Sequence, residues 1–271
     1  MIRSPNDTVG AAVADGVCTL TLTRPKSLNA IDGDMADALR AVTEAAAADE
    51  EVRCVAIRGA GDHFMAGGDI AAFRSWLDEI PDPEERRSRF EAFVHRVHPS
   101  IEAIRSMPKP VIAAVHGAVA GFGLSLMSAC DLAIANENAF FTLAYCHIGV
   151  SPDGSSTYTL PRTVGLKRSF EMAYLGERFG AEEAKAMGLV NRVVPEDAFE
   201  TAVDGLARCL AAGPTRAYAN AKALLNASAH RSLGEQLAAE AAAFADCGAG
   251  EDFAEGIAAF LEKRTPSFRG R

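Results

Sequence analysis

Two continuous apolar runs constrain the fold of this chain more than any other feature of its sequence. They are "VRCVAIRGAG" at 52–61 and "KPVIAAVHG" at 109–117, and each ends at glycine. Strands that are buried on both faces have this pattern, which is typical of parallel sheets covered by helices. Directly before the first run, residues 32–51 have helical spacing behind a candidate N-cap, Asp32. The sequence therefore predicts an α/β fold with a mainly parallel sheet.

The rest of the chain divides into a further strand, a charged segment and a helical end. "GVCTLTLTRP" at 16–25 alternates between apolar and polar residues and predicts a strand. "LDEIPDPEERRSRF" at 77–90 is charged and interrupted by prolines, which indicates a mobile surface excursion. From about Gly165 onward the pattern is almost wholly helical. We therefore expect an α/β core over 1–194 and a helical region over 195–271.

Charge and cysteine content exclude several classes of function. The net charge of −9 leaves no concentrated basic face for binding nucleic acid. The six cysteines form no CxxC pair and have no histidine at metal-ligand spacing, which predicts reduced, mostly buried thiols and no metal site. The N-terminus lacks the apolar core of a signal peptide, and no stretch of about 18 apolar residues occurs. A cytoplasmic protein without a membrane partner is the resulting expectation.

Two glycine-rich stretches follow the two apolar runs and lead into helices. They are "GAGDHFMAGGDI" at 59–70 and "HGAVAGFGLSLMSACD" at 116–131. Unpaired N–H groups in such strand-to-helix turns can hold an anion or a developing oxyanion, although the glycines could also serve only a tight turn. The chain has no GxGxxG after its first strand, no GxxxxGK[ST], and no GxSxG around Ser125. Dinucleotide and P-loop sites are thus excluded, and a serine hydrolase is disfavoured.

Six stretches together resemble the enoyl-CoA hydratase/isomerase family, also called the crotonase superfamily. The resemblance implies a spiral of ββα repeats followed by a C-terminal helical trimerisation region, in a homotrimer or a dimer of trimers. It also implies an acyl-CoA thioester as substrate and no separate cofactor, because coenzyme A is part of that substrate. The stretches are "RPKSLNAI" (24–31), "HFMAGGDI" (63–70), "KPVIAAVHGAVAGFGLSLMSACDLAIA" (109–135), "IGVSPDGSSTYTLPRTVG" (148–165), "GLVNRVV" (188–194) and "GIAAFLEKR" (256–264).

The resemblance also implies site residues, position by position. The family's paired oxyanion donors correspond to the backbone N–H groups of Ala66 and Phe122, which would hold the thioester carbonyl as it becomes an enolate. Phe244 and Lys263 are similar to an aromatic residue and a lysine that reach the coenzyme A of a neighbouring subunit, although both could be ordinary surface residues. The stretches that contact coenzyme A in the family correspond here to Lys26, Leu28, Ala30, Ala66, Gly68, Asp69 and Ile70.

The chain departs from the family pattern at the acid/base positions. Hydratases of the family use two glutamates to activate water, and here Ser125 and Tyr145 stand at those positions. Tyr145 could be a pocket wall or a hydrogen-bond donor to the substrate. Asp153, in "SPDGSS", stands where isomerase-type members carry their acid, and the segment most resembles the phenylacetate-pathway isomerase branch. A Pro-Asp-Gly triplet is also ordinary turn chemistry.

Three functions follow from this pattern. The first is an enoyl-CoA isomerase in which Asp153 carries the proton. The second is a hydratase with a non-standard acid/base set, and the third is an acyl-CoA-binding protein without turnover. The histidines give no further candidate, since we expect His116 and His147 to be structural and His63 to be exposed to solvent.

Overall fold

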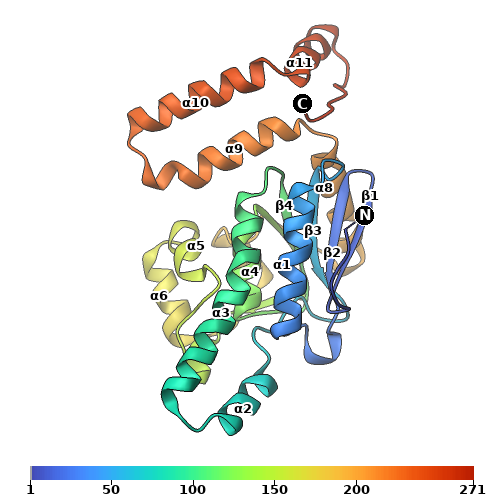
Figure 1. The fold of residues 1–271 in the computed structure, drawn as a ribbon. Coiled ribbons are helices and arrows are strands. Elements are labelled where there is room, and N and C mark those ends of the chain that lie inside the picture. The colour runs from blue at the N-terminus through green and yellow to red at the C-terminus, as the bar shows by residue number, and fades with distance from the viewer. Residues whose placement is uncertain (1) are drawn as a thin grey trace.

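The computed structural model describes residues 2–271, which form a large sheet with helices on both faces and a helical arm at the C-terminal end (Figure 1). The strands are β1 (Val9–Ala14), β2 (Val17–Leu22), β3 (Cys54–Gly59), β4 (Val111–Val115), β5 (Ala118–Ala120), β6 (Leu132–Asn136), β7 (Phe140–Thr142), β8 (Phe179–Gly180) and β9 (Arg192–Val194). The large sheet has the order β1-β2-β3-β4-β6-β9, and β5-β7-β8 form a small second sheet. In the large sheet β1 is antiparallel to β2 and the other pairs are parallel, which confirms the expected sheet.

The central strands are buried on both faces because different helices cover the two sides. Alternate residues of β4 point to opposite faces, so Val111 packs with α1 (Gly33–Ala48) and α3 (Pro83–Ser106), and Ile112 packs with α8 (Phe199–Ala211). Asp32 caps α1 as expected, since its side chain accepts a hydrogen bond from the Met35 N–H. The other helices are α2 (Ile70–Glu79), α4 (Phe122–Ala129), α5 (Ser156–Thr163), α6 (Leu166–Leu175), α7 (Ala181–Ala186), α9 (Thr215–Ala227), α10 (Leu233–Gly248) and α11 (Glu251–Glu262).

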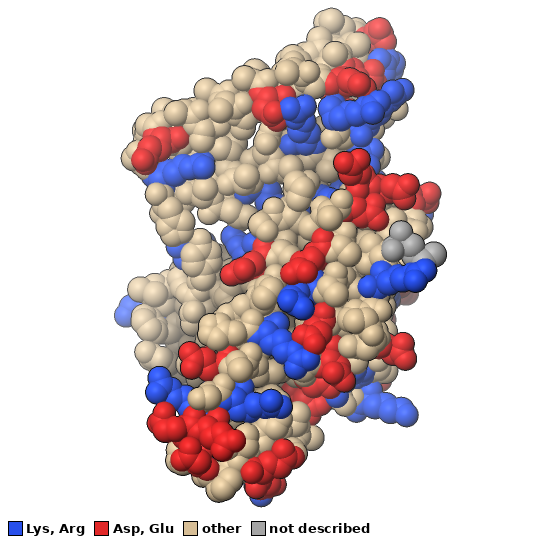
Figure 2. Space-filling model, in the orientation of Figure 1, with Lys and Arg blue, Asp and Glu red and all other residues tan. Residues whose placement is uncertain are grey.

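The C-terminal helices do not all belong to one layer. Helix α8 packs on the sheet, whereas α9, α10 and α11 form an arm that extends away from it (Figure 1). On the face drawn in Figure 2, acidic and basic side chains are interspersed over the body, and a hollow separates the arm from it. A division of roles between residues 1–194 and 195–271 stays a prediction.

The expected mobile surface excursion over residues 77–90 lies at the surface, but it is helical rather than an irregular loop. The segment belongs to α2 and α3, and only residues 80–82 lie between the two helices. The Asp82 side chain accepts from the Glu85 N–H, and Pro83 follows at the first helical position. The proline and the charges are therefore signals for the start of a helix.

The structure corrects two further expectations, one on the first strand and one on the burial of the cysteines. Strand β1 precedes the first strand expected from the sequence and pairs with it along its whole length. All six cysteines are free, but only Cys18 and Cys54 are buried, and Cys209 is exposed.

Over residues 2–271, no helix has both the length and the apolar character needed to cross a membrane.

Candidate active site

The two glycine-rich turns lie side by side next to the small sheet. Met65 donates its N–H to the Ala118 carbonyl at 3.1 Å and accepts from the Ala120 N–H at 2.9 Å, which sets a parallel register between Met65 and Val119. Gly68 lies three residues after Met65, and Phe122 lies three residues after Val119. A Cβ atom built on Gly67 would lie 3.6 Å from the Phe122 nitrogen. Gly68 and Phe122 therefore occupy equivalent positions in two adjoining turns.

Both of these N–H groups are free of protein acceptors. Phe122 is the first residue of α4, so its N–H has no partner within the helix and lies at the positive end of the helix dipole. In the part of the chain that the structure describes, no acceptor binds the N–H of either Gly68 or Phe122. Two such donors aimed at one point can stabilise a negatively charged oxygen.

The expected donor Ala66 requires a correction. Its N–H already donates to the Leu28 carbonyl oxygen at 3.0 Å, which ties the 24–31 segment to the turn. An amide engaged in this way is not available to a substrate oxygen. The structure therefore points to Gly68, two residues later, as the partner of Phe122. Sequence reasoning had placed Gly68 only among the coenzyme A contacts, because register between distant segments leaves no local signal.

Backbone conformation explains why glycine is needed in these turns. Gly121 has φ of 51° and ψ of −120°, a combination that side-chain-bearing residues avoid. Gly67 has φ of 93°, and a Cβ built on Gly121 would lie 3.4 Å from the Gly67 Cα. The close approach of the two turns thus depends on both glycines.

Asp153 lies beside the first turn of α4. A Cβ atom built on the next residue, Gly154, would lie 2.6 Å from the Phe122 ring and 3.0 Å from the Ser125 Cβ, so this turn packs directly on the helix. The Asp153 carboxylate accepts a hydrogen bond from the Tyr145 hydroxyl through Oδ1. It does not cap α5, which begins after Ser155 without a side-chain capping bond. The chain does turn at Asp153, but the Asp153 carboxylate faces the Tyr145 hydroxyl.

The environment of Asp153 suits a group that takes up a proton and returns it. Burial raises the pKa of this carboxyl, whereas the Tyr145 hydrogen bond and the nearby His98 imidazole lower it, and the net direction is upward. A base whose pKa lies closer to neutrality can release its proton as well as bind it. His98 comes from α3, and no motif in the sequence identified it as a neighbour of Asp153.

The residues expected to contact coenzyme A differ in whether their side chains are exposed and free of other bonds. Lys26, Leu28 and Ile70 are exposed beside the turns, whereas Ala30 is buried. Asp69 is already engaged, because it caps α2 through the Ala71 and Ala72 N–H groups and pairs with Arg24 at 2.8 Å. Burial raises the pKa of Asp69, but the Arg24 hydrogen bond and the capping bonds bring it below its usual value. Its carboxylate is therefore structural.

Helix α2 places an aromatic ring over the Gly68 donor. A Cβ atom built on Gly68 would lie 2.6 Å from the Phe73 ring. Phe73 in turn packs with Trp76 and with Phe90 and Phe93 of α3, at ring-centroid distances of 5.4–5.6 Å. This aromatic cluster fixes the α2–α3 hairpin beside the turns and adds an apolar wall that the sequence pattern did not identify.

The two C-terminal candidates lie apart from the other site residues within one chain. Phe244 is 71% exposed on α10 and packs with Phe253, and Lys263 is exposed at the end of α11. Both belong to the arm, in which α10 contacts α9 and α11 rather than the glycine-rich turns. A role for them at the site of a neighbouring subunit stays a prediction.

The histidines near the turns are bound to backbone groups. His116 contacts the Gly61 carbonyl through Nε2 at 2.8 Å, and His147 contacts the Gly176 carbonyl at 3.0 Å. His63 differs from the expectation of solvent exposure, because its Nδ1 accepts from the Ala118 N–H at 3.1 Å. It therefore helps to hold the two turns together. Over residues 2–271, no group of three or more His, Cys, Asp or Glu side chains could hold a metal ion.

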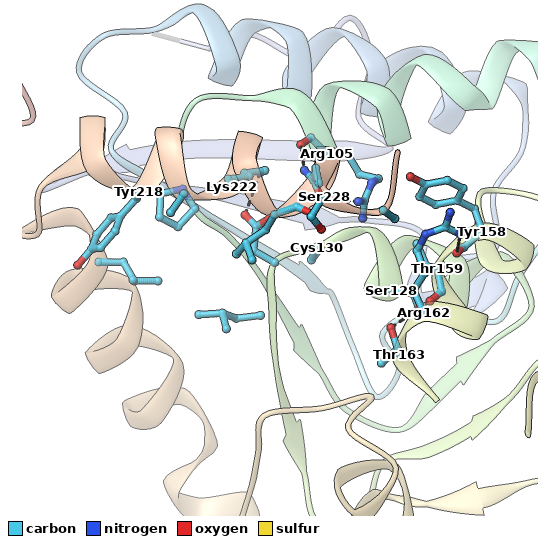
Figure 3. A pocket seen from close by; sticks show the side chains of 18 residues that line it. Arg105, Ser128, Cys130, Tyr158, Thr159, Arg162, Thr163, Tyr218, Lys222 and Ser228 are labelled. Carbon is cyan, nitrogen blue, oxygen red and sulfur yellow. Dashed lines mark hydrogen bonds and ion pairs between the residues drawn. The ribbon is translucent and has the colours of Figure 1, made fainter. Parts of the chain in front are cut away.

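One well-defined cavity lies away from these turns. It measures about 550 Å³ and lies between α5 and α9, where Figure 3 shows Arg105, Tyr158 and Lys222 around it. Lys222 pairs with Asp131 at 2.8 Å and donates to the Ile104 and Lys109 carbonyls. These bonds attach the arm to the body of the protein.

Replacing Lys222 with methionine should therefore destabilise the protein. The change leaves the Asp131 carboxylate without its partner, and we expect the free energy of unfolding to fall by about 2 kcal/mol. This is less than for a fully buried pair, because the Asp131 side chain is 26% exposed. Urea unfolding measures the change, with Lys185→Met on the exposed end of α7 as control. Equal stability of the variant and the wild type would contradict this role for the pair.

Comparisons with known proteins agree over nearly the whole chain. The family model described as Enoyl-CoA hydratase/isomerase matches residues 12–271. A Rhodobacter capsulatus protein named "Probable enoyl-CoA hydratase" is 39% identical, covering 97% of this chain and 98% of its own length. The 1,2-epoxyphenylacetyl-CoA isomerase of Escherichia coli is 35% identical, covering 96% of this chain and 97% of its own. The crystal structure of an enoyl-CoA hydratase from Polaromonas sp. JS666 has a TM-score of 0.89 at 35% identity, covering 96% and 99% of the two chains.

Proposed function

Since this chain belongs to the enoyl-CoA hydratase/isomerase family, whose members act on CoA thioesters, we propose that it moves the double bond of an enoyl-CoA. One observation carries the proposal: the turn that holds Asp153 packs on the first turn of α4, where the Phe122 N–H is free, and the raised pKa of Asp153 suits a proton carrier. The two positions that hold glutamates in hydratases of the family are occupied here by Ser125 and Tyr145. One carboxylate suffices for moving a proton, whereas adding water commonly uses two.

The reaction needs only these groups. The Gly68 and Phe122 N–H groups bind the thioester oxygen, and Asp153 removes a proton from C2 of a 3-enoyl-CoA. The electron pair of the broken C–H bond moves into the thioester, which becomes a dienolate held by the two donors. Asp153 then returns its proton to C4, so that the double bond lies between C2 and C3. No atom is gained or lost, and coenzyme A enters and leaves as part of the substrate.

Binding of coenzyme A involves the exposed loops and a second subunit in this proposal. Lys26, Leu28 and Ile70 are accessible beside the turns and would contact the pantetheine and adenine parts. Phe244 and Lys263 would reach the coenzyme A of a neighbouring subunit in a homotrimer or a dimer of trimers. Large apolar side chains on the arm support an assembly, because a free chain would leave Phe260 82% exposed and Leu261 75% exposed.

The oligomeric state gives a direct prediction. We expect light scattering coupled to size exclusion to give a mass three or six times that of the 28.6 kDa chain. Phe260→Glu should shift the protein toward monomer at micromolar concentration, because it places a charge in a buried apolar contact. Glu262→Gln, an exposed neighbour on the same helix, is the control. A monomeric wild type would contradict the proposed assembly.

Incubation with 3-enoyl-CoA and 2-enoyl-CoA in deuterated water tests the reaction type. We expect migration of the double bond with deuterium at the protonated carbon. A 3-hydroxyacyl-CoA product would instead favour the hydratase, the function in the name of the Rhodobacter capsulatus relative. Unchanged substrates that still bind in calorimetry would indicate a non-catalytic acyl-CoA-binding protein.

A further inference from the structure

Three hydroxyl groups donate to Asp153, and two of them, those of Tyr145 and Ser125, lie next to each other. The Tyr145 hydroxyl donates to Oδ1 of the carboxylate, and Ser125 Oγ donates to the Asp153 main-chain carbonyl at 2.9 Å. The two hydroxyl oxygens lie 3.4 Å apart. Each hydroxyl has one proton, so with both protons bound to Asp153 the contact between Ser125 and Tyr145 is not a hydrogen bond. Both side chains therefore serve the same residue.

We propose that Tyr145 is a positioning residue that occupies Oδ1 of Asp153, so that Oδ2 alone is the base in the proton transfer. This inference rests on the proposed isomerase function. A carboxylate with two equivalent oxygens can rotate and present either one, whereas a bond to one oxygen fixes which lone pairs face the substrate. The hydroxyl also stabilises the charged form of a carboxylate that burial disfavours.

Tyr145 acts as a donor and not as a second proton carrier. Burial and the negative charge of Asp153 raise the pKa of its hydroxyl far above the usual value for tyrosine. The hydroxyl therefore keeps its proton at neutral pH. The other groups that face Asp153 are His98 from α3, whose charge also favours the carboxylate, and Ser156 from α5, whose hydroxyl donates to the Asp153 carbonyl at 3.0 Å.

The backbone is bent on both sides of this contact. Ala144, directly before Tyr145, has φ of 54°, and Ser155, two residues after Asp153, has φ of 77°. Residues with a Cβ atom rarely adopt this left-handed conformation, and where they do the surrounding structure holds them there. The two bends turn Tyr145 and Asp153 toward each other between α4 and α5. The main-chain conformation on both sides of the contact therefore holds Tyr145 and Asp153 together.

Tyr145→Phe tests the proposal, because it removes the hydroxyl and keeps the ring. The basic form of Asp153 is the active one, so kcat/KM rises with pH through its pKa. Loss of the donor should move this limb upward by about one to two pH units, so that kcat/KM falls by about ten- to a hundredfold at pH values below the limb. We expect an unchanged KM. Tyr158→Phe is the matched control, because the Tyr158 hydroxyl contacts His230 at 3.0 Å and makes no hydrogen bond to Asp153.

A second measurement separates this inference from the proposed function. Carbon-13 NMR of the Asp153 carboxyl, assigned by its loss in Asp153→Asn, reports the pKa of the resting protein without turnover. A higher pKa in Tyr145→Phe supports the positioning role even if the wild type proves not to be an isomerase. If the pKa and the pH profile of Tyr145→Phe match those of the wild type, the inference is wrong, whatever reaction the protein performs.

Discussion

Replacing Asp153 with asparagine should lower kcat for double-bond migration by about 10²- to 10⁴-fold, the contribution usually made by a positioned acid/base group. The amide has nearly the same shape and can still accept the Tyr145 hydrogen bond through its oxygen. It cannot take up a proton. KM should change little, because the oxyanion donors belong to the backbone of Gly68 and Phe122. Initial rates with 3-enoyl-CoA, together with deuterium incorporation at C2 and C4, measure the effect.

The same variant should be more stable than the wild type near pH 7. Burial raises the pKa of Asp153 in the folded protein, so its stabilising contribution is present at low pH and is lost as the pH rises through the folded pKa. Asparagine removes that pH-dependent loss. A decrease in activity accompanied by a higher Tm excludes misfolding as the cause, and Asp204→Asn on the exposed side of α8 is the control. Full activity of Asp153→Asn would contradict the isomerase mechanism.

Replacing Gly121 with alanine should reduce kcat by about 10²- to 10³-fold, the usual effect of losing one oxyanion donor. The backbone of Gly121 has a positive φ that alanine adopts only with strain, at a cost of about 1–3 kcal/mol. Its Cβ would lie 3.4 Å from the Gly67 Cα, which is van der Waals contact, so the strain comes from the backbone conformation. Relief of this strain moves the Phe122 N–H away from the Gly68 N–H, since Phe122 directly follows the altered residue.

Gly188→Ala separates this effect from general strain. Gly188 also has a positive φ, at 80°, but a Cβ there meets no atom within 4 Å. We expect a similar loss of Tm in both variants and a loss of kcat in Gly121→Ala alone. Binding of an unreactive acyl-CoA analogue, measured by calorimetry, should weaken in Gly121→Ala, because the thioester oxygen loses a donor. Equal activities of the two variants would contradict the assignment of the Phe122 N–H.

The parts of the fold that follow from local patterns were predicted from the sequence. The apolar runs correspond to β3 and β4 in the structure, Asp32 caps α1, and the family resemblance is confirmed. The segment 77–90 was wrongly predicted because prolines and charges occur both in loops and at helix starts. The aromatic packing of Phe73 with Phe90 and Phe93, which the local pattern does not reveal, holds the two helices together.

The candidate site was predicted only in part for a related reason. Asp153 and Phe122 could be found by counting along the chain from a motif, and the structure brings them together. Which amide of the 66–68 turn is free depends on a hydrogen bond from Ala66 to Leu28, and which group donates to Asp153 depends on how Tyr145 is turned. His98 approaches from a different helix. Contacts of this kind are set by tertiary packing, which no single stretch of sequence records.

The bridge between Met65 and Val119 also brings the two turns together at the spacing of neighbouring strands. Neighbouring strands lie about 4.8 Å apart, and two N–H nitrogens at that spacing, each about 2.9 Å from one oxygen, subtend roughly 110° at it. That angle is close to the one between the lone pairs of a carbonyl oxygen. Strand-like spacing between two main-chain segments is therefore suited to holding such an oxygen, and it needs no side chain at position 68, where the residue is glycine.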